Sequence, residues 1–173
     1  MDSLIINRNK VFENVRIGTG GKVEDYCIVG VPPQGQNESD FETVIGYGAC
    51  IRSHTVIYAG NRIGNNFQTG NKANIRELNT IGNNVRIGTL AVIEHHVSIG
   101  DNVRIHNQVF IPEYSVLEEG TRIGPNVVIN NAKYPLIPDV KENLKLSKRV
   151  VIAYKVTRVT WNKVNLQAEA LHP

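Results

Sequence analysis

Residues 81–105 read IGNNVRIGTLAVIEHHVSIGDNVRI, and this stretch shows the pattern that decides the fold. An aliphatic side chain returns at every sixth residue. From residue 45 to residue 129 these positions hold fourteen isoleucines or leucines and one threonine: Ile45, Ile51, Ile57, Ile63, Thr69, Ile75, Ile81, Ile87, Ile93, Ile99, Ile105, Ile111, Leu117, Ile123 and Ile129. Six residues of a helix turn the side chain away from a common face, and a flat strand alternates with period two. A period of six therefore predicts a chain that coils through short strands.

A second period gives the length of one coil. Ile-Gly pairs begin eighteen residues apart, at Ile45, Ile63, Ile81 and Ile99. Three hexads thus complete one circuit, which is the pattern of a hexapeptide β-helix. In such a prism the aliphatic side chains stack along the axis at about 4.8 Å and form a buried column. Asparagines follow the Ile-Gly pairs, and we interpret them as turn residues because asparagine tolerates the left-handed conformation of tight corners.

The repeat and its Ile-Gly-x-Asn corners resemble the hexapeptide-repeat acyltransferases, in particular those that acetylate nucleotide-linked amino sugars. This resemblance implies an all-β fold, a left-handed parallel β-helix that works as a homotrimer. We expect the β-helix to cover residues 1–138, with one loop ejected over residues 31–43, where turn-forming residues break the spacing. Residues 139–173 are a diverged C-terminal extension in which residues 149–156 are a candidate strand. The polar stretch around Thr69 either lines a cleft or marks an irregular register.

Composition places further bounds on the protein. Its 173 residues suit one domain, and the formal net charge of +3 comes from the C-terminal extension, which has seven basic and three acidic residues. The sequence shows neither an apolar run of membrane-spanning length nor a secretory leader, so we expect a cytoplasmic protein that does not enter the membrane. The basic extension lacks interleaved aromatic residues or a recognition motif, so nucleic-acid binding is not expected.

His95 is the first candidate for a catalytic residue. It lies outside the aliphatic column, and the circuit places it between Glu77 and Glu113 of the neighbouring coils. A carboxylate at that distance fixes the tautomer of the imidazole and favours its protonated form, as a general base needs. The sequence Ile93-Glu94-His95 also resembles the Ile-Glu-His motif of acetyltransferases acting on 4-amino nucleotide sugars, which implies the role of base for His95.

Substrate contacts are expected around the same histidine. The circuit places His96 next to Tyr114. Residues 124–135 resemble the Gly-Pro-x5-Asn-x3-Pro run of acetyltransferases acting on 3-amino nucleotide sugars, which implies that Asn131 lies near the sugar or the cofactor. In that group an Asn and a Glu on adjacent coils hold the amino sugar. The matching positions in this chain are Asn107 and Glu113. We therefore expect these residues to bind the substrate: His96, Asn107, Tyr114 and Asn131.

Arg86, Arg104 and Arg122 form a further ladder at eighteen-residue spacing. Like charges on neighbouring coils repel one another unless something anionic lies along them. The phosphates of a nucleotide or of coenzyme A would serve, so these arginines are candidates for cofactor binding, with acetyl-CoA as the co-substrate that the resemblance implies. The alternative is a solvated face that is neutralised by acids such as Asp101.

These features favour transfer of an acetyl group from acetyl-CoA to the amine, or as a second choice a hydroxyl, of a nucleotide-linked sugar in polysaccharide or glycoconjugate synthesis. Two alternatives stay open. The first is a non-catalytic trimeric β-helix, either a scaffold or a sugar-nucleotide-binding protein. The second is a relative of the β-helix carbonic anhydrases, but the spacing of the histidines in this chain does not match that family, so no metal site is expected.

Overall fold

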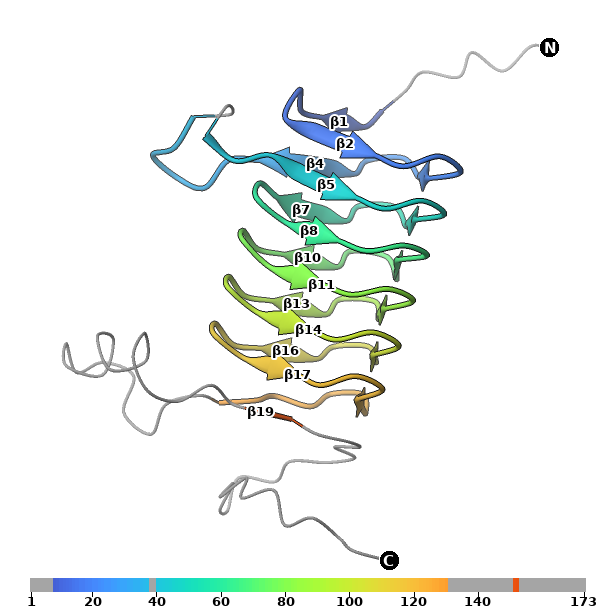
Figure 1. Ribbon diagram of the computed structural model, residues 1–173, viewed down its shortest axis with the longest axis vertical. Coiled ribbons are helices and arrows are strands. Elements are labelled where there is room, and N and C mark those ends of the chain that lie inside the picture. The colour runs from blue at the N-terminus through green and yellow to red at the C-terminus, as the bar shows by residue number, and fades with distance from the viewer. Residues whose placement is uncertain (1–7, 38–39, 131–150, 153–173) are drawn as a thin grey trace, which may run out of the picture.

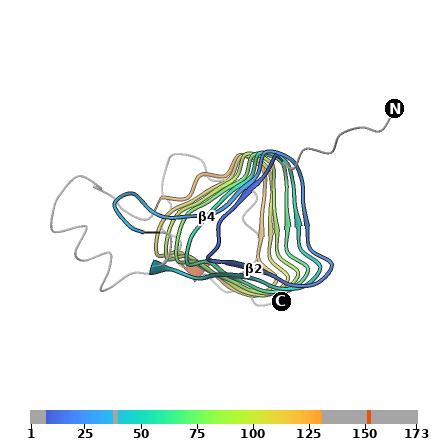
Figure 2. The same ribbon diagram turned by 90° about the horizontal axis from the view of Figure 1, so that it is seen from above.

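The structure, a computed structural model, describes residues 8–37, 40–130 and the strand at 151–152. The chain winds around a three-faced prism whose coils are stacked along the long axis (Figure 1), and the view down that axis shows a triangular section (Figure 2). Neighbouring strands are parallel and form three separate sheets, one on each face. The predicted all-β, left-handed parallel β-helix is confirmed.

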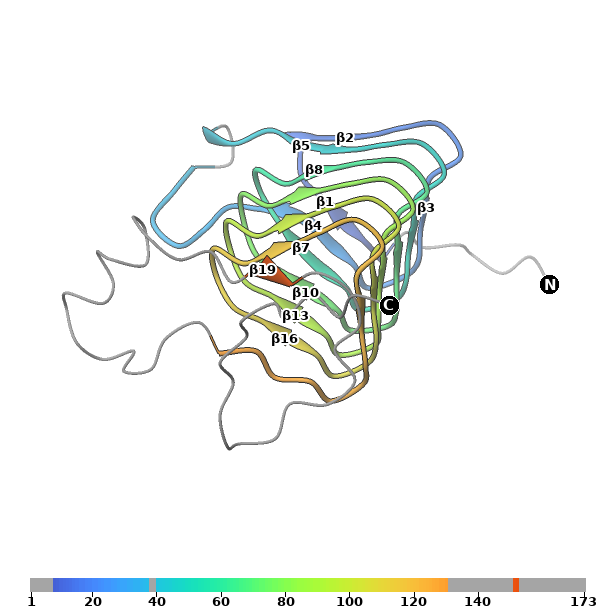
Figure 3. The same ribbon diagram turned by 60° about the horizontal axis from the view of Figure 1, so that its bottom comes forward.

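Each face takes one strand from every coil, in the order A, B, C along the chain (Figure 3). Face A is formed by β1 (Lys10–Val11), β4 (Ile28–Val31), β7 (Val56–Tyr58), β10 (Asn74–Ile75), β13 (Val92–Ile93) and β16 (Phe110–Ile111). Face B is formed by β2 (Val15–Ile17), β5 (Thr43–Ile45), β8 (Arg62–Ile63), β11 (Thr80–Ile81), β14 (Ser98–Ile99), β17 (Val116–Leu117) and β19 (Val151–Ile152). Face C is formed by β3 (Lys22–Val23), β6 (Cys50–Ile51), β9 (Gln68–Thr69), β12 (Arg86–Ile87), β15 (Arg104–Ile105) and β18 (Arg122–Ile123).

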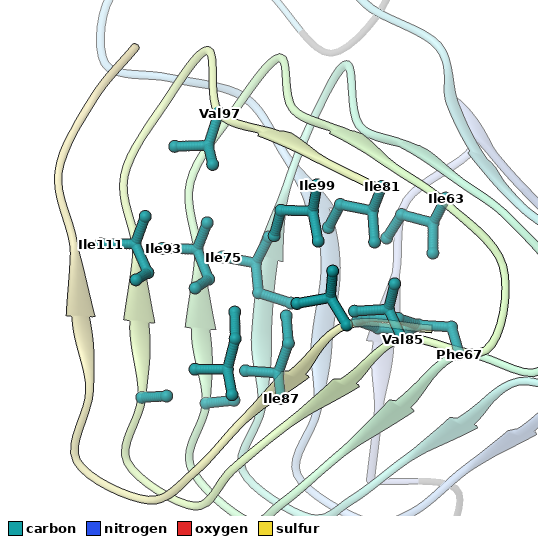
Figure 4. Packing of buried hydrophobic residues seen from close by; sticks show 14 of the residues in the cluster. Ile63, Phe67, Ile75, Ile81, Val85, Ile87, Ile93, Val97, Ile99 and Ile111 are labelled. Atoms are coloured by element: carbon teal, nitrogen blue, oxygen red, sulfur yellow. The ribbon is translucent and has the colours of Figure 1, made fainter. Parts of the chain in front are cut away.

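The core is the predicted aliphatic column. Residues eighteen apart are paired across neighbouring strands, as Ile75 is with Ile93 on face A and Ile81 with Ile99 on face B. Figure 4 shows these side chains stacked in rows that point toward the axis. They are almost completely buried, and burial of one such side chain stabilises the fold by roughly 1.5–3 kcal/mol. The column therefore holds the prism together without any layer on its outer faces.

Thr69 keeps its place in this column. Its side chain is buried, and Ile87 of the next coil pairs with it in the same register as the aliphatic residues. The Thr69 hydroxyl accepts a hydrogen bond from the backbone N–H of Arg52 at 2.9 Å and lies 3.2 Å from the Thr55 hydroxyl. Thr69 is therefore in register with Ile87, and two other residues of the polar stretch, Asn66 and Gln68, line a groove on face C.

The corners between faces require a left-handed residue. Asn66, Asn84 and Asn102 have φ values of 55°, 56° and 60° at the corner between faces B and C, which confirms that they are turn residues. The corner between faces A and B, called the A–B corner below, puts His96 and Tyr114 at the same point, with φ values of 57° and 59°. The fold therefore fixes the backbone at both of these residues.

One loop leaves the prism at the A–B corner. The chain departs after Val31 at the end of β4 and returns at Thr43, the first residue of β5, so both ends of the predicted loop are strand residues (Figure 1). On its return, the Phe41 carbonyl accepts a hydrogen bond from the Asn14 side-chain amide at 2.7 Å. The pairing between Val31 and Tyr58 is shifted where the loop departs.

In the C-terminal extension, Val151–Ile152 forms β19, which pairs in parallel with β17 on face B. These two residues lie within the predicted strand at residues 149–156. The remainder of the extension lies outside the described residues. Within the part of the chain that the structure describes, no helix is both long and apolar enough to cross a membrane.

Candidate functional site

His95 lies at the A–B corner, between β13 and β14. The same corner of the preceding coil carries Glu77 and that of the following coil carries Glu113. Two backbone hydrogen bonds join these corners, from the His96 N–H to the Glu77 carbonyl and from the Tyr114 N–H to the His95 carbonyl, each at 3.3 Å. The predicted stacking of Glu77, His95 and Glu113 is therefore present in the fold.

The partner of the His95 ring is the neighbouring histidine. The Nδ1 atoms of His95 and His96 lie 2.8 Å apart, at hydrogen-bond distance. The His96 ring stacks on the Tyr114 ring at a centroid distance of 5.2 Å, and the His95 ring meets the same tyrosine edge-on at 5.4 Å. Both histidines and Tyr114 thus form one aromatic cluster, and we refer to it as the histidine cluster.

Arg76 holds the carboxylate of Glu77, one of the two glutamates predicted to orient His95. The Arg76 Nε and Nη2 atoms donate to the two Glu77 oxygens at 2.8 and 3.0 Å, and Arg76 also lies 3.9 Å from the Glu94 carboxylate. Burial raises the pKa of Glu77, but the hydrogen bonds from Arg76 and the positive charges of Arg76 and His95 lower it below its ordinary value. The expected ion pair between Arg76 and Glu94 is present, and Glu77 is the closer partner.

The histidine pair combines a base with a donor. When both rings are neutral, one Nδ1 carries the shared proton and the other accepts it. The ring that donates through Nδ1 has an unprotonated Nε2, and the ring that accepts has an Nε2–H group. The pair therefore presents one basic nitrogen and one N–H donor whichever ring donates. Arg76, Glu77 and Glu94 together leave one net negative charge beside the cluster.

The predicted arginine ladder lies on face C. Arg104 pairs across the sheet with Arg86 on one side and Arg122 on the other. The three side chains line a groove of about 400 Å³ together with glycine and amide residues: Gly48, Asn66, Gln68, Asn84 and Asn102. Among the described residues, no carboxylate forms an ion pair with any of these arginines. The expected neutralisation by Asp101 is not seen, because its carboxylate accepts hydrogen bonds from Asn83.

The structure brings only part of the predicted site together within one chain. The arginine groove borders the corner between faces B and C, whereas the histidine cluster lies at the A–B corner. Asn107 lies at the third corner, where its side-chain oxygen accepts the Thr89 N–H at 3.0 Å, one whole face away from Glu113. Asn131 lies outside the described residues.

The sequence contained a signal for this separation. Arg86 and Arg104 are each nine residues from His95, half of an eighteen-residue circuit, so they belong on another side of the prism. The eighteen-residue spacing relates residues of different coils, so it does not reveal the contact between the adjacent rings of His95 and His96. The positive φ of His96 at the corner is what brings the two rings together. Across the described ranges, no group of three His, Cys, Asp or Glu side chains is arranged to hold a metal ion.

Residues 80–113 match the family model described as bacterial transferase hexapeptide (six repeats). The match covers the coils that carry the histidine cluster and two of the three ladder arginines, and it confirms the predicted hexapeptide repeat. No curated protein matches the chain.

Solved structures with the same fold include LpxA, a UDP-N-acetylglucosamine acyltransferase from Bacteroides fragilis 9343. It is 21% identical over 71% of this chain and 51% of that chain, with a TM-score of 0.67, so this chain spans about half of its length. A mutant of AntD, an N-acyltransferase from Bacillus cereus, in complex with dTDP and coenzyme A, is 14% identical over 75% of this chain and 90% of that chain, with a TM-score of 0.28. The UDP-N-acetylglucosamine acyltransferase from Campylobacter jejuni is 21% identical over 68% and 59%, with a TM-score of 0.30. The first likeness shows the fold, and the other two superpose too loosely for a comparison of sites.

Proposed function

We propose that this protein transfers an acetyl group from acetyl-CoA to the amine of a nucleotide-linked sugar, with His95 as the general base. The observation that carries the proposal is the contact between the Nδ1 atoms of His95 and His96 at a solvent-accessible corner. This contact leaves a basic ring nitrogen at a position that the amino sugar can reach from solvent. The hexapeptide match and the shared fold with an enzyme named as a UDP-N-acetylglucosamine acyltransferase support the reaction class.

In the proposed reaction the His95 Nε2 takes a proton from the amine as the amine nitrogen attacks the thioester carbonyl. The C–N bond forms, the C–S bond breaks, and the departing thiolate takes its proton from the imidazolium. In this step the His95 Nδ1–H donates to His96 Nδ1, which leaves the His95 Nε2 free to take the proton. A sugar hydroxyl in place of the amine would need the same proton transfer.

The substrate is assigned to the surroundings of the histidine cluster. His96 contributes an Nε2–H donor when His95 acts as the base, and Tyr114 packs against both rings. Glu113, one coil below, is assigned to the amino group of the sugar by resemblance. Asn107 and Asn131 are assigned to substrate binding by resemblance alone.

Acetyl-CoA is assigned to the arginine groove, because the three guanidinium groups and the amide side chains that line it suit a phosphorylated ligand. The groove and the histidine cluster belong to different corners of one chain. A site that uses both therefore needs the groove of one copy beside the A–B corner of another. This requirement supports the homotrimer that the resemblance implies.

The test is thiol release from acetyl-CoA in the presence of a UDP-linked 3-amino or 4-amino sugar, with acetyl-CoA binding measured by calorimetry. We expect His95→Gln to lower kcat by about 10²–10⁴-fold, which is the usual contribution of a general base, while acetyl-CoA binding is retained. His106→Gln is the matched control, since His106 is an exposed histidine at another corner. Unchanged turnover in His95→Gln, or a folded protein that does not bind acetyl-CoA, would overturn the proposal.

A non-catalytic sugar-nucleotide-binding β-helix is the second candidate. It is favoured by the distance around the prism between the arginine groove and the histidine cluster within one chain. This candidate predicts that the protein binds a UDP-linked amino sugar and releases no thiol from acetyl-CoA.

A further inference from the structure

Two buried asparagines lie inside the A–B corner. The side chain two residues before each column position fills the inside of a corner, and at the A–B corner these residues are Thr43, Asn61, Asn79, Val97 and Ser115. Asn61 and Asn79 are 0% and 1% exposed. A buried amide is costly unless its polar atoms are bonded, so the contacts of these two side chains define what they do for the fold.

Asn79 connects the two coils that carry the ionic cluster and the histidine cluster. Its Nδ2 donates to the Arg76 carbonyl at 2.8 Å, next to Glu77. Its Oδ1 accepts the Val97 N–H at 2.7 Å, next to His96. One buried side chain therefore bonds to the backbone of two neighbouring coils, next to Glu77 on one and next to His96 on the other.

Asn61 makes the same kind of contacts one coil earlier. Its Nδ2 donates to the Tyr58 and Arg76 carbonyls at 2.7 and 2.8 Å, and its Oδ1 accepts the Asn79 N–H at 3.1 Å. None of these bonds reaches the coil of His95. Asn61 is therefore a natural control for Asn79, equally buried and similarly bonded.

We propose that Asn79 is a positioning residue for the histidine cluster, which it holds in place relative to the Arg76–Glu77–Glu94 ionic cluster by its two hydrogen bonds to the backbone. The amide series ends at Val97, so no side chain performs this task from within the coil of the histidines. The bond from the Val97 N–H to Asn79 Oδ1 reaches the coil of the histidines directly after His96. Only the kinetic part of this inference rests on the proposed function.

Serine substitutions separate the two bonds of Asn79. Ser115 shows how serine fits this corner: its hydroxyl donates to the Pro112 carbonyl three residues earlier at 2.7 Å. Asn79→Ser can make the equivalent bond to the Arg76 carbonyl, and it loses the bond to the Val97 N–H. Asn61→Ser can likewise keep the bond to the Tyr58 carbonyl, while it loses its bonds to the Arg76 carbonyl and to the Asn79 N–H.

The experiment compares both serine variants by NMR titration of the histidine rings, with thermal unfolding as the measure of stability. We expect both variants to lose thermal stability, whereas the titration curves of His95 and His96 change only in Asn79→Ser. In the transfer assay, kcat should fall by about 10²-fold in Asn79→Ser with little change in KM, the cost of a small misplacement of a catalytic group, and should stay near the parent value in Asn61→Ser. Asn79→Gln, which has the same amide on a longer side chain, should not restore the titration.

Histidine titrations that are the same in Asn79→Ser and in the parent protein would overturn the inference, as would equal changes in both serine variants. The NMR result does not depend on catalysis. A change in histidine titration without any transfer activity would therefore refute the proposed function and leave the positioning role of Asn79 supported.

Discussion

At the scale of single residues, the A–B corner combines a strained backbone with a partly buried ion pair. His96 and Tyr114 adopt the left-handed conformation that costs a residue with a side chain roughly 1–2 kcal/mol, whereas the equivalent point of the B–C corner uses asparagine. In exchange, the strained corner turns two adjacent rings to one side. Glu77, with a side chain that is 11% exposed, depends on Arg76 for its charge.

The Arg76–Glu77 pair makes stability depend on pH. The folded-state pKa of Glu77 lies below its ordinary value of 4.5, so its contribution is fully present above that value and is lost as the pH falls through the folded-state pKa. Arg76→Gln leaves the carboxylate buried without its partner. We expect the free energy of unfolding to fall by about 1–3 kcal/mol at pH 7, with a smaller difference from the parent protein at pH 3.

Urea unfolding at both pH values checks this expectation. Arg62→Gln is the control, because Arg62 is an exposed arginine of face B that forms no ion pair among the described residues. A deficit in Arg76→Gln of equal size at pH 7 and pH 3 would show that Glu77 is not the group responsible.

At the scale of elements, the corners repeat their hydrogen bonds from coil to coil. At the B–C corner, a side-chain oxygen of one coil accepts a backbone N–H of the coil before it. The Asn65 N–H donates to Asn83 Oδ1 at 2.9 Å, and the Asn83 N–H donates to Asp101 Oδ1 at 2.7 Å. The glycines that directly follow the strands of face B leave room for these contacts. A Cβ at Gly82, for example, would lie 2.2 Å from Asp101 Oδ1. Repetition of the sequence thus produces repeated hydrogen bonds as well as a repeated core.

Thr69 provides the test at this scale. Replacing it with valine makes the column wholly aliphatic, yet leaves the Arg52 N–H and the Thr55 hydroxyl without their bonds to the Thr69 hydroxyl. We expect Thr69→Val to lower the free energy of unfolding by about 1–3 kcal/mol, the cost of a buried donor without a partner. Chemical denaturation measures it, with Ile87→Val, expected to cost about 0.5–1.5 kcal/mol, as a reference for a small change of volume in the column. A more stable Thr69→Val would mean that burial outweighs hydrogen bonding there.

At the scale of the whole molecule, the prism separates chemistry by face. Face C carries the three ladder arginines, the A–B corner carries the histidine cluster, and the third corner carries Asn107. A rigid β-helix cannot bend one corner toward another, because every coil is fixed by strand pairing on three sides. Any site that uses two of these regions therefore requires a second copy of the chain.

Complementation between two inactive variants tests this requirement. His95→Gln and Arg104→Gln each remove one half of the proposed site. When the two are refolded together, we expect transfer activity to return at roughly a quarter of the sites, since each parent side chain is present in half of the chains of a symmetric oligomer. Light scattering would establish that the chains assemble. Mixed assemblies without any recovered activity would place both residues in a site within one chain, or outside the site altogether.

The sequence by itself determined the coil. A period of six repeated over eighteen residues leaves one way to bury every aliphatic side chain, so the column, the three faces, and the stacking of Glu77, His95 and Glu113 follow from it. The same arithmetic, applied around the prism, separates His95 from Arg104 by half a circuit. These features depend only on how many residues lie between two positions, and the sequence contains that number.

The tertiary structure alone decided which neighbours make contact. Stacking offered His95 a carboxylate on either side, yet Glu77 is held by Arg76, and the Nδ1 of His95 meets the Nδ1 of His96. The bonds of Asn79 to two coils are likewise visible only once both coils are in place. Spacing brings backbones together, whereas the choice of partner depends on side-chain rotamers, on the left-handed turn at His96 and on burial, which only the folded chain defines.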